Sequence, residues 1–328
     1  MSRAPAAHRS NRLECRHVAL RTSTLTSPSP SAPAQPSAEV AQRMRLKGIG
    51  LMCIALACFA CLDTLGKWLG TSMNPMQVVW TRYTAALVFV LIIFNPLRDP
   101  KVLVTKRPWL QAVRSALLFL STALNFFALQ YLQLDQTVSI MFANPFIVAI
   151  ISGPLLGEWI GPRRWMAVVV GFIGVLVVTQ PWSGNMHWAM GLTLLGTTCY
   201  AVYNILTRML AGHDSAGTTS IYSVAFGAIV ATALVPGYWT TPDSWSVVAA
   251  MVAIGALGAF GHWVLIIAHG YAPAGILAPF IYGQIIWMIG LGWAVFGQVP
   301  AVNTLVGAGI VIASGLYLLF RERTIRGG

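Results

Sequence analysis

The segment YLQLDQTVSIMFANPFIVAIISGPLLGEWIGPRRWMAVVVGFIGVLVV at residues 131–178 decides the fold of this chain. It holds two nearly continuous apolar runs, at about 136–156 and 163–181, separated by a short polar stretch with Arg163 and Arg164. Each run is close to the ~20 residues that an α-helix needs to cross the ~30 Å core of a bilayer. The segment therefore predicts two consecutive membrane-spanning helices with a charged connection between them.

Similar apolar runs occupy the rest of the chain. They do not alternate between apolar and polar residues, as the strands of a membrane barrel would. Of 328 residues, 56% are hydrophobic and 9% are charged, whereas a soluble domain has about 25% charged residues. We therefore predict an all-α integral membrane protein with ten transmembrane helices, embedded in a lipid bilayer. The other eight runs are 48–70, 76–95, 109–130, 188–210, 216–238, 246–269, 273–296 and 301–320.

The chain has a net charge of +12, and the positions of its basic residues indicate how it is oriented in the membrane. In a ten-helix arrangement the Lys and Arg residues near the helix ends fall on one side, as at Arg98 and Arg163, and the opposite loops carry Asp135 and Asp243. Positive loops stay in the cytoplasm. This predicts a multi-pass protein of the bacterial inner (plasma) membrane with both termini cytoplasmic, and it gives no basic face for nucleic acid.

Residues 1–46 differ from the rest. They are basic and rich in Ser and Pro, with SPSPSAPAQP at 27–36, a composition that predicts disorder. Met44 opens MRLKGIGLM, which suggests a start codon assigned too early. The remainder divides into residues 47–182 and 187–322, with five predicted helices each.

These two halves resemble each other in sequence. GLMCIALACFACLDTLGKWL at 50–69 matches GLTLLGTTCYAVYNILTRML at 191–210 at six of twenty positions without a gap. Because five is odd, duplicated halves would insert with opposite orientations, and inverted repeats are typical of transporters with a substrate site near the midplane. The matched pairs include Asp63 with Asn204, Lys67 with Arg208, Asn144 with Gln284, and Gly157 with Gly297.

Residues 131–178 resemble helix 4, the Gly-Glu pair (here Gly157-Glu158) and the Gly-rich helix 5 of EamA-domain members of the drug/metabolite transporter superfamily. VVWTRYTAALVFVL at 78–91 resembles their helix 2, with Arg82 at the expected place, while Gln298 stands where the pattern has Glu. The resemblance covers about 47–322. It implies transport of amino acids, nucleotide sugars, cofactors or drugs, and the first half is most similar to bacterial members linked to riboflavin and S-adenosylmethionine uptake.

Ionisable residues inside the predicted spans are the first candidates for a site, because each costs at least about 2.5–3.5 kcal/mol to insert. Asp63 and Arg82 fall at matching depth on adjacent helices, so we predict that they pair. The pair either binds a coupling proton or a substrate's ammonium and carboxylate, or it only pins two helices together. Lys67 and Arg114 lie nearer the membrane surfaces, where they could serve the site or simply snorkel.

Neutral polar and aromatic residues near the midplane complete the predicted site. Pro145 follows Asn144 at the centre of its span and would open the helix locally. Aromatic rings around polar groups suit a planar or cationic ligand, although each residue could equally form an ordinary interhelical hydrogen bond. The candidates are Trp80, Asn125, Asn144, Tyr203, Asn204, His262, Tyr282 and Gln284.

Together these features predict a secondary active transporter of a small polar metabolite, such as a cofactor or an amino acid, working by alternating access and coupled to protons. One alternative is an integral membrane enzyme, such as a lipid or prenyl transferase. The nine Asp and Glu residues are scattered, however, with no DxxxD or HExxH motif. The other alternative, a non-transporting scaffold, leaves the repeat unexplained. No cofactor or metal is predicted, since zinc-binding spacings are absent.

Overall fold

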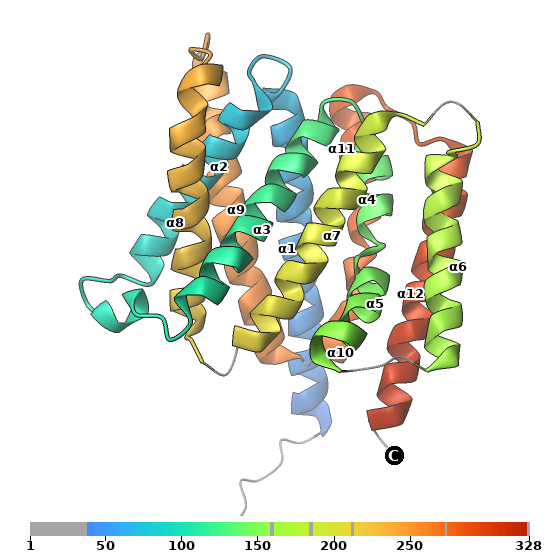
Figure 1. The fold of residues 1–328 in the computed structure, drawn as a ribbon. Coiled ribbons are helices and arrows are strands. Elements are labelled where there is room, and N and C mark those ends of the chain that lie inside the picture. The colour runs from blue at the N-terminus through green and yellow to red at the C-terminus, as the bar shows by residue number, and fades with distance from the viewer. Residues whose placement is uncertain (1–37, 158–160, 184–185, 211–212, 273, 327–328) are drawn as a thin grey trace, which may run out of the picture.

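The chain forms a bundle of helices in a computed structural model that describes residues 38–157, 161–183, 186–210, 213–272 and 274–326 (Figure 1). Within these ranges the regular elements are α-helices and short 3-10 helices, without a strand. The all-α prediction is therefore confirmed for the described part of the chain.

The first half contains α1 (Ala38–Leu69), α2 (Pro75–Ile93), η1 (Pro100–Leu103), α3 (Pro108–Leu129), α4 (Leu134–Met141), α5 (Asn144–Leu156) and α6 (Pro162–Thr179). The second half contains α7 (Trp188–Leu210), α8 (Ala216–Leu234), η2 (Val235–Tyr238), α9 (Trp245–Tyr271), α10 (Ala274–Ile281), α11 (Gln284–Phe296) and α12 (Val302–Arg326). Proline is in the first turn of α2, α3 and α6. It is tolerated there because a backbone N–H in the first turn has no acceptor within the helix.

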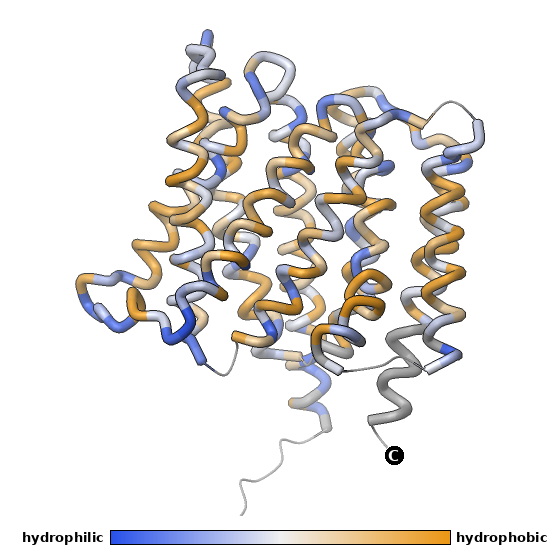
Figure 2. Tube along the Cα trace, in the orientation of Figure 1, coloured by the Kyte–Doolittle hydropathy of each residue, from blue (hydrophilic) through white to orange (hydrophobic). Residues whose placement is uncertain are grey.

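The helices have the length and composition of membrane spans. Eight stretches of the described chain are long and apolar enough to cross a bilayer, and α4 and α5 together form one of them, Leu134–Leu155. The apolar parts of α6 and α12 are shorter, at Trp165–Thr179 and Val302–Tyr317. Figure 2 shows hydrophobic residues along the helices and hydrophilic residues gathered towards their ends. The chain is thus an integral membrane protein.

The first helix begins earlier than the sequence predicts. α1 starts at Ala38, so residues 38–46 of the tail predicted to be disordered are helical, and residues 1–37 lie outside the described part. Glu39 accepts a hydrogen bond of 2.7 Å from Arg43 one turn later. Such a pair supports an exposed helix by a few tenths of a kcal/mol. The described N-terminal helix and the C-terminus lie at the same end of the bundle (Figure 1).

Two predicted spans are each broken into two helices. The break between α4 and α5 falls at Phe142 and Ala143, and the break between α10 and α11 falls at Tyr282 and Gly283. The bounds of α4 and α10 differ by 140 residues at both ends, as do those of α5 and α11. Pro145 sits in the first turn of α5, as expected of a residue that cannot continue the preceding helix.

The matched glycines close equivalent helices. Gly157 ends α5 and Gly297 ends α11, with φ of 72° and 65°. This left-handed conformation is easy for glycine and strained for other residues. Glycine therefore occurs at both matched positions for the same reason, because the chain takes a left-handed conformation where each helix ends.

The two halves are interleaved rather than side by side. The closest helix pairs are α1 with α9, α3 with α7, α2 with α8, and α6 with α12 (Figure 1). Each pair takes one helix from each half. Exchanging the halves turns the α1–α9 pair into the α7–α3 pair and leaves the other two pairs unchanged, so the packing has the symmetry expected of a duplicated chain.

Candidate functional site

Asp63 lies on the buried face of α1, with a residue exposure of 8%. One carboxylate oxygen, Oδ1, accepts a 3.3 Å hydrogen bond from Asn125 Nδ2 on α3. The other oxygen, Oδ2, has no hydrogen-bond partner among the described residues, and it is not fully buried, in contrast to the unpartnered Oδ1 atom of Asn125. Asp63 therefore keeps one accessible acceptor within the bundle.

Arg82 faces the same region from α2. Its Nη1 donates to Thr122 Oγ1 at 2.9 Å, and the neighbouring Tyr83 hydroxyl donates to the same oxygen at 3.1 Å. The guanidinium also lies over the rings of Phe126 and Tyr83, at 5.7 and 5.8 Å. These contacts hold the cation in place through one of its nitrogens and its flat face.

The predicted direct pairing of Asp63 and Arg82 is wrong. No N–O distance of 4.0 Å or less joins them, and the one ion pair formed among the described residues is Arg43–Glu39. Instead, α3 supplies each with a separate partner, Thr122 for the arginine and Asn125 for the aspartate, three residues apart and thus on one helix face. The opposite charges still interact through space. We call Asp63, Arg82, Tyr83, Thr122 and Asn125 the central cluster.

The second half of the chain adjoins this cluster through α9. Gly258 lets α9 approach Arg82, whose Nε is 3.9 Å from the place that a Cβ at Gly258 would take. One turn later, the His262 ring packs edge-on against Phe59, with ring centres 4.8 Å apart. His262 is an exposed residue of α9. His262 is therefore positioned on α9 one turn after Gly258, and its role in the site stays a prediction.

A second arginine, Arg114 of α3, fixes the aromatic residues of α7. It is 3% exposed, and it donates to Thr207 and Ser223 hydroxyls at 2.6 Å each and to the Tyr203 hydroxyl at 2.8 Å. Tyr203 in turn stacks on Tyr200 at 5.4 Å. The expectation that Arg114 could snorkel to the surface is wrong, because two helices, α7 and α8, satisfy its donors inside the bundle.

Lys67 is also buried rather than extended to the surface. Its ammonium donates to the backbone carbonyls of Leu129 and Leu132 at 2.7 and 2.5 Å, at the C-terminal end of α3, and lies 5.6 Å from the Phe296 ring centre. A cation stabilises the unpaired carbonyls of a helix end. Lys67 interacts through space with Asp135, which is 4% exposed and has a sealed, unpartnered Oδ2. We call Lys67 and Asp135 the outer pair.

The helix breaks bring together residues from both halves. Phe142 and Tyr282, 140 positions apart, meet edge-on with ring centres 5.0 Å apart. Near them are unpartnered polar atoms, since Asn144 Oδ1 and the Tyr282 hydroxyl are buried without a hydrogen bond. Gln284 follows its break as Asn144 does, and it is half-buried.

Two further predicted residues are not joined to the central cluster. Trp80 donates to Thr232 at 3.0 Å and packs edge-on against Trp239 at 5.4 Å, so it ties α2 to α8 and η2. Asn204 is half-buried on α7, and no contact of the structure connects it to Asp63 or Arg82. Asp135, predicted to be a loop charge, is buried in the structure, and its place directly before the apolar run at 136–156 is the sequence signal for this.

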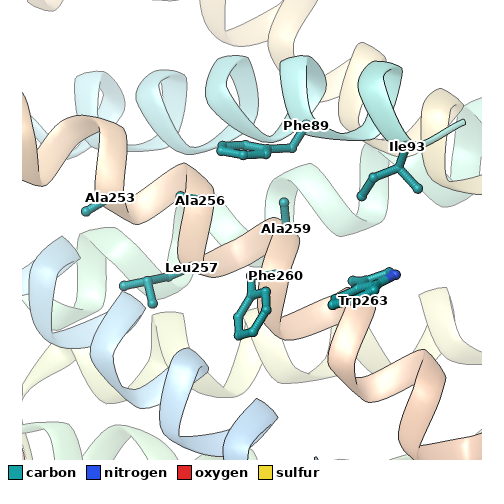
Figure 3. Close-up of a pocket in the computed structure, with 8 residues that line it drawn as sticks. All are labelled: Phe89, Ile93, Ala253, Ala256, Leu257, Ala259, Phe260 and Trp263. Carbon is teal, nitrogen blue, oxygen red and sulfur yellow. The ribbon is translucent and has the colours of Figure 1, made fainter. Parts of the chain in front are cut away.

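An apolar groove on the surface is separate from these polar groups. It is an open groove of about 580 Å³ between α2 and α9, lined by apolar side chains that include Phe89, Ile93, Phe260 and Trp263 (Figure 3). Such a lining suits lipid chains rather than a polar metabolite. Among the described residues no three His, Cys, Asp or Glu side chains gather as metal ligands.

Comparison with known proteins agrees with a transport function. The model of a family described as the EamA-like transporter family matches the chain twice, over residues 46–180 and 187–321. A solved crystal structure with 16% sequence identity covers 87% of this chain and 99% of its own, with a TM-score of 0.59, and it shows likeness of fold alone.

Several characterised relatives match nearly the whole chain. The S-adenosylmethionine uptake transporter of Rickettsia conorii is 26% identical over 278 residues, covering 85% of this chain and 94% of that protein. The riboflavin transporter of Vibrio cholerae is 25% identical over 276 residues, covering 83% and 93%. The pseudopaline exporter of Pseudomonas aeruginosa is 25% identical over 285 residues, covering 85% and 97%.

Proposed function

The chain belongs to the EamA-like transporter family, and on this premise we propose that it is a secondary active transporter of a small polar metabolite in the bacterial inner membrane. Its relatives carry the names of importers and of an exporter, so the direction of transport does not follow from them. Their names and the family make a membrane enzyme or a scaffold the weaker alternative.

One observation carries this proposal. Within a largely apolar bundle, Asp63 and Arg82 carry opposite charges that are not in direct contact and that keep unused hydrogen-bonding groups. Charges in a membrane interior are costly and usually serve a transport path or a partner. Helices α1, α2 and α3 of the first half and α9 of the second surround them. A site between the halves is what alternating access requires.

The proposed architecture has ten crossings in two inverted five-helix halves. In it, α4 with α5 and α10 with α11 are single crossings that are broken at their centres, and α6 and α12 are the fifth and tenth crossings. The equal 140-residue offsets and the symmetric helix pairs support this arrangement. Broken helices at corresponding positions in two halves are a common feature of transporter sites.

We further propose that a proton gradient drives transport and that Asp63 is where the proton enters the cycle. A carboxylate with one free, accessible oxygen can take up a proton or release it to a ligand. Asp135 is the less suitable carboxylate, since its free oxygen is sealed from water in this conformation.

Uptake into proteoliposomes under an imposed pH gradient tests the proposal. With a panel of riboflavin, S-adenosylmethionine and amino acids, we expect saturable uptake that follows the gradient, and Asp63→Asn should reduce it at least about 10-fold, since hydrogen bonds to a charged group contribute about 1.5–3 kcal/mol. Uptake that ignores both the gradient and Asp63→Asn would contradict proton coupling. Absence of saturable flux in both directions would contradict the transporter itself.

A further inference from the structure

The free groups of the central cluster have a definite chemical character. Asp63 uses Oδ1 for Asn125 and leaves Oδ2 open. Arg82 uses Nη1 for Thr122, while Nε and Nη2 have no partner among the described residues and are not sealed from solvent. The unused groups are therefore one carboxylate oxygen on α1 and the Nε and Nη2 edge of a guanidinium on α2, more than 4.0 Å apart.

The protein itself cannot fill these positions in this conformation. The other buried cations are engaged elsewhere, since Lys67 caps the end of α3 and Arg114 is bonded to hydroxyls on α7 and α8. Asp135, the other buried carboxylate, interacts with Lys67 in the outer pair. His262 is the remaining ionisable group beside Arg82, and its Nδ1 is 2.8 Å from the Gly258 carbonyl of its own helix.

A static ion pair would look different. If Asp63 and Arg82 served only to join α1 and α2, direct contact would give the lowest energy, because desolvated opposite charges attract strongly. Instead, Thr122 and Asn125 hold them apart on one face of α3. A ligand that carries both a positive and a negative group could bind Asp63 with the first and Arg82 with the second.

From this geometry, and resting on the transport function proposed above, we infer that the substrate carries a zwitterionic α-amino-acid head group. Its ammonium would donate to Asp63 Oδ2, and its carboxylate would accept from the Nε and Nη2 edge of Arg82. A guanidinium edge binds a carboxylate through two parallel hydrogen bonds, which an ammonium cannot provide.

The compounds that the relatives' names mention differ in whether they carry this head group. S-adenosylmethionine carries an α-amino-acid head group, whereas riboflavin has none. Aromatic rings adjoin the site, with Phe126 under the guanidinium, Phe59 against His262 and the Tyr200–Tyr203 stack nearby on α7. They would suit a planar or cationic remainder of the substrate.

The test uses purified full-length protein in proteoliposomes and measures competition for uptake. The panel contains the standard amino acids, S-adenosylmethionine and riboflavin. For each transported amino-acid compound, the matched amine without the carboxylate and the matched keto acid without the amine are compared. We expect each analogue to compete about 10- to 100-fold more weakly than the parent, as hydrogen bonds to charged groups contribute about 1.5–3 kcal/mol.

Variants then assign each end of the head group. Arg82→Gln should remove the preference for the parent over the amine, and Asp63→Asn should remove the preference for the parent over the keto acid, so that each ratio falls to about 1. Asp135→Asn, a matched buried carboxylate outside the central cluster, should leave both ratios unchanged. Because ratios are compared within one variant, a lower yield of folded protein does not affect them.

The outcomes separate this inference from the proposed function. Saturable transport of riboflavin without any amino-acid compound would overturn the head-group inference and leave the transporter standing. Ratios that persist in Arg82→Gln and Asp63→Asn would overturn the assignment of the site. Absence of uptake, export and competition for the whole panel would overturn both.

Discussion

At the scale of single residues, the buried charges of this protein divide into groups with separate tasks. Lys67 and Arg114 have their donors satisfied by carbonyls and hydroxyls, so their charges serve to join helices. Asp63 and Arg82 keep free groups. Burial alone therefore does not identify a transport site, and the remaining hydrogen-bonding capacity is the better guide.

Lys67 offers a direct stability test. Lys67→Met would leave the carbonyls of Leu129 and Leu132 without their buried donor, and we expect a loss of roughly 2–3 kcal/mol, seen as a lower Tm in detergent. Lys101→Met, at an exposed position of η1, is the matched control and should change little. A variant with unchanged Tm and abolished transport would instead assign Lys67 to the transport cycle.

At the scale of elements, close contact between α2 and α9 shapes the surroundings of Arg82. Gly255 and Gly258 lie on one stretch of α9, and a Cβ at Gly255 would be only 2.1 Å from the Ala85 Cβ and 3.1 Å from the Ala85 Cα. Small residues such as glycine let two membrane helices approach closely. The close contact of α2 with α9 also brings Gly258 of α9 next to the Arg82 guanidinium.

Gly255→Ala tests this contact. The added methyl group must push α2 and α9 apart, and we expect a loss of about 1–3 kcal/mol in stability together with weaker substrate binding. Gly50→Ala on α1 is the control, because nothing lies within 4 Å of its added Cβ. Removing a glycine from the helix there should stabilise by up to about 1 kcal/mol. Equal effects of the two substitutions would contradict the packing argument.

At the scale of the whole molecule, one contact joins the halves away from the membrane spans. Asp214, between α7 and α8, accepts hydrogen bonds from Thr105 Oγ1, the Lys106 backbone and Gln111 Nε2 at 2.5, 2.9 and 2.9 Å. Partial burial raises the pKa of Asp214, but these hydrogen bonds outweigh it and lower the pKa below its usual value. The folded protein therefore favours the ionised form.

Stability should follow the ionisation of Asp214. A lowered folded pKa adds stability that is complete above the unfolded pKa of about 3.9 and is lost as pH falls through the folded value. We expect Asp214→Asn to reduce Tm at pH 7 by the equivalent of about 1 kcal/mol, and the difference from the parent protein to vanish once the pH has fallen through the lowered folded pKa of Asp214. Asp243→Asn, at an exposed loop, serves as the control, and a pH-independent difference would contradict this account.

The proposed topology can be tested on the same scale. With ten crossings, a reporter at the C-terminus should lie in the cytoplasm, while a cysteine introduced as Asp243→Cys, in the described loop before α9, should react with a membrane-impermeant thiol reagent added from outside. Labelling of this position only after the membrane is opened would contradict the ten-crossing, inverted arrangement.

The sequence by itself determined the helices and their nature. The apolar runs, ended by Pro, Gly and Asn, are local signals, so the predicted spans coincide with the helices within a few residues, including the correspondence of Asn144 with Gln284 and Gly157 with Gly297. The early start of α1 was missed because its first turns are polar and carry no membrane signal.

Only the tertiary structure decided which polar groups meet. Asp63 and Arg82 were predicted to touch because their depths match, but depth does not specify rotation about a helix axis or the presence of a third helix between two others. Here α3 offers Thr122 and Asn125 at hydrogen-bonding distance, and Lys67 finds the end of α3 within its reach. These partners lie from 40 to 62 residues away in the chain, so packing of whole helices, rather than local pattern, sets the chemistry of the site.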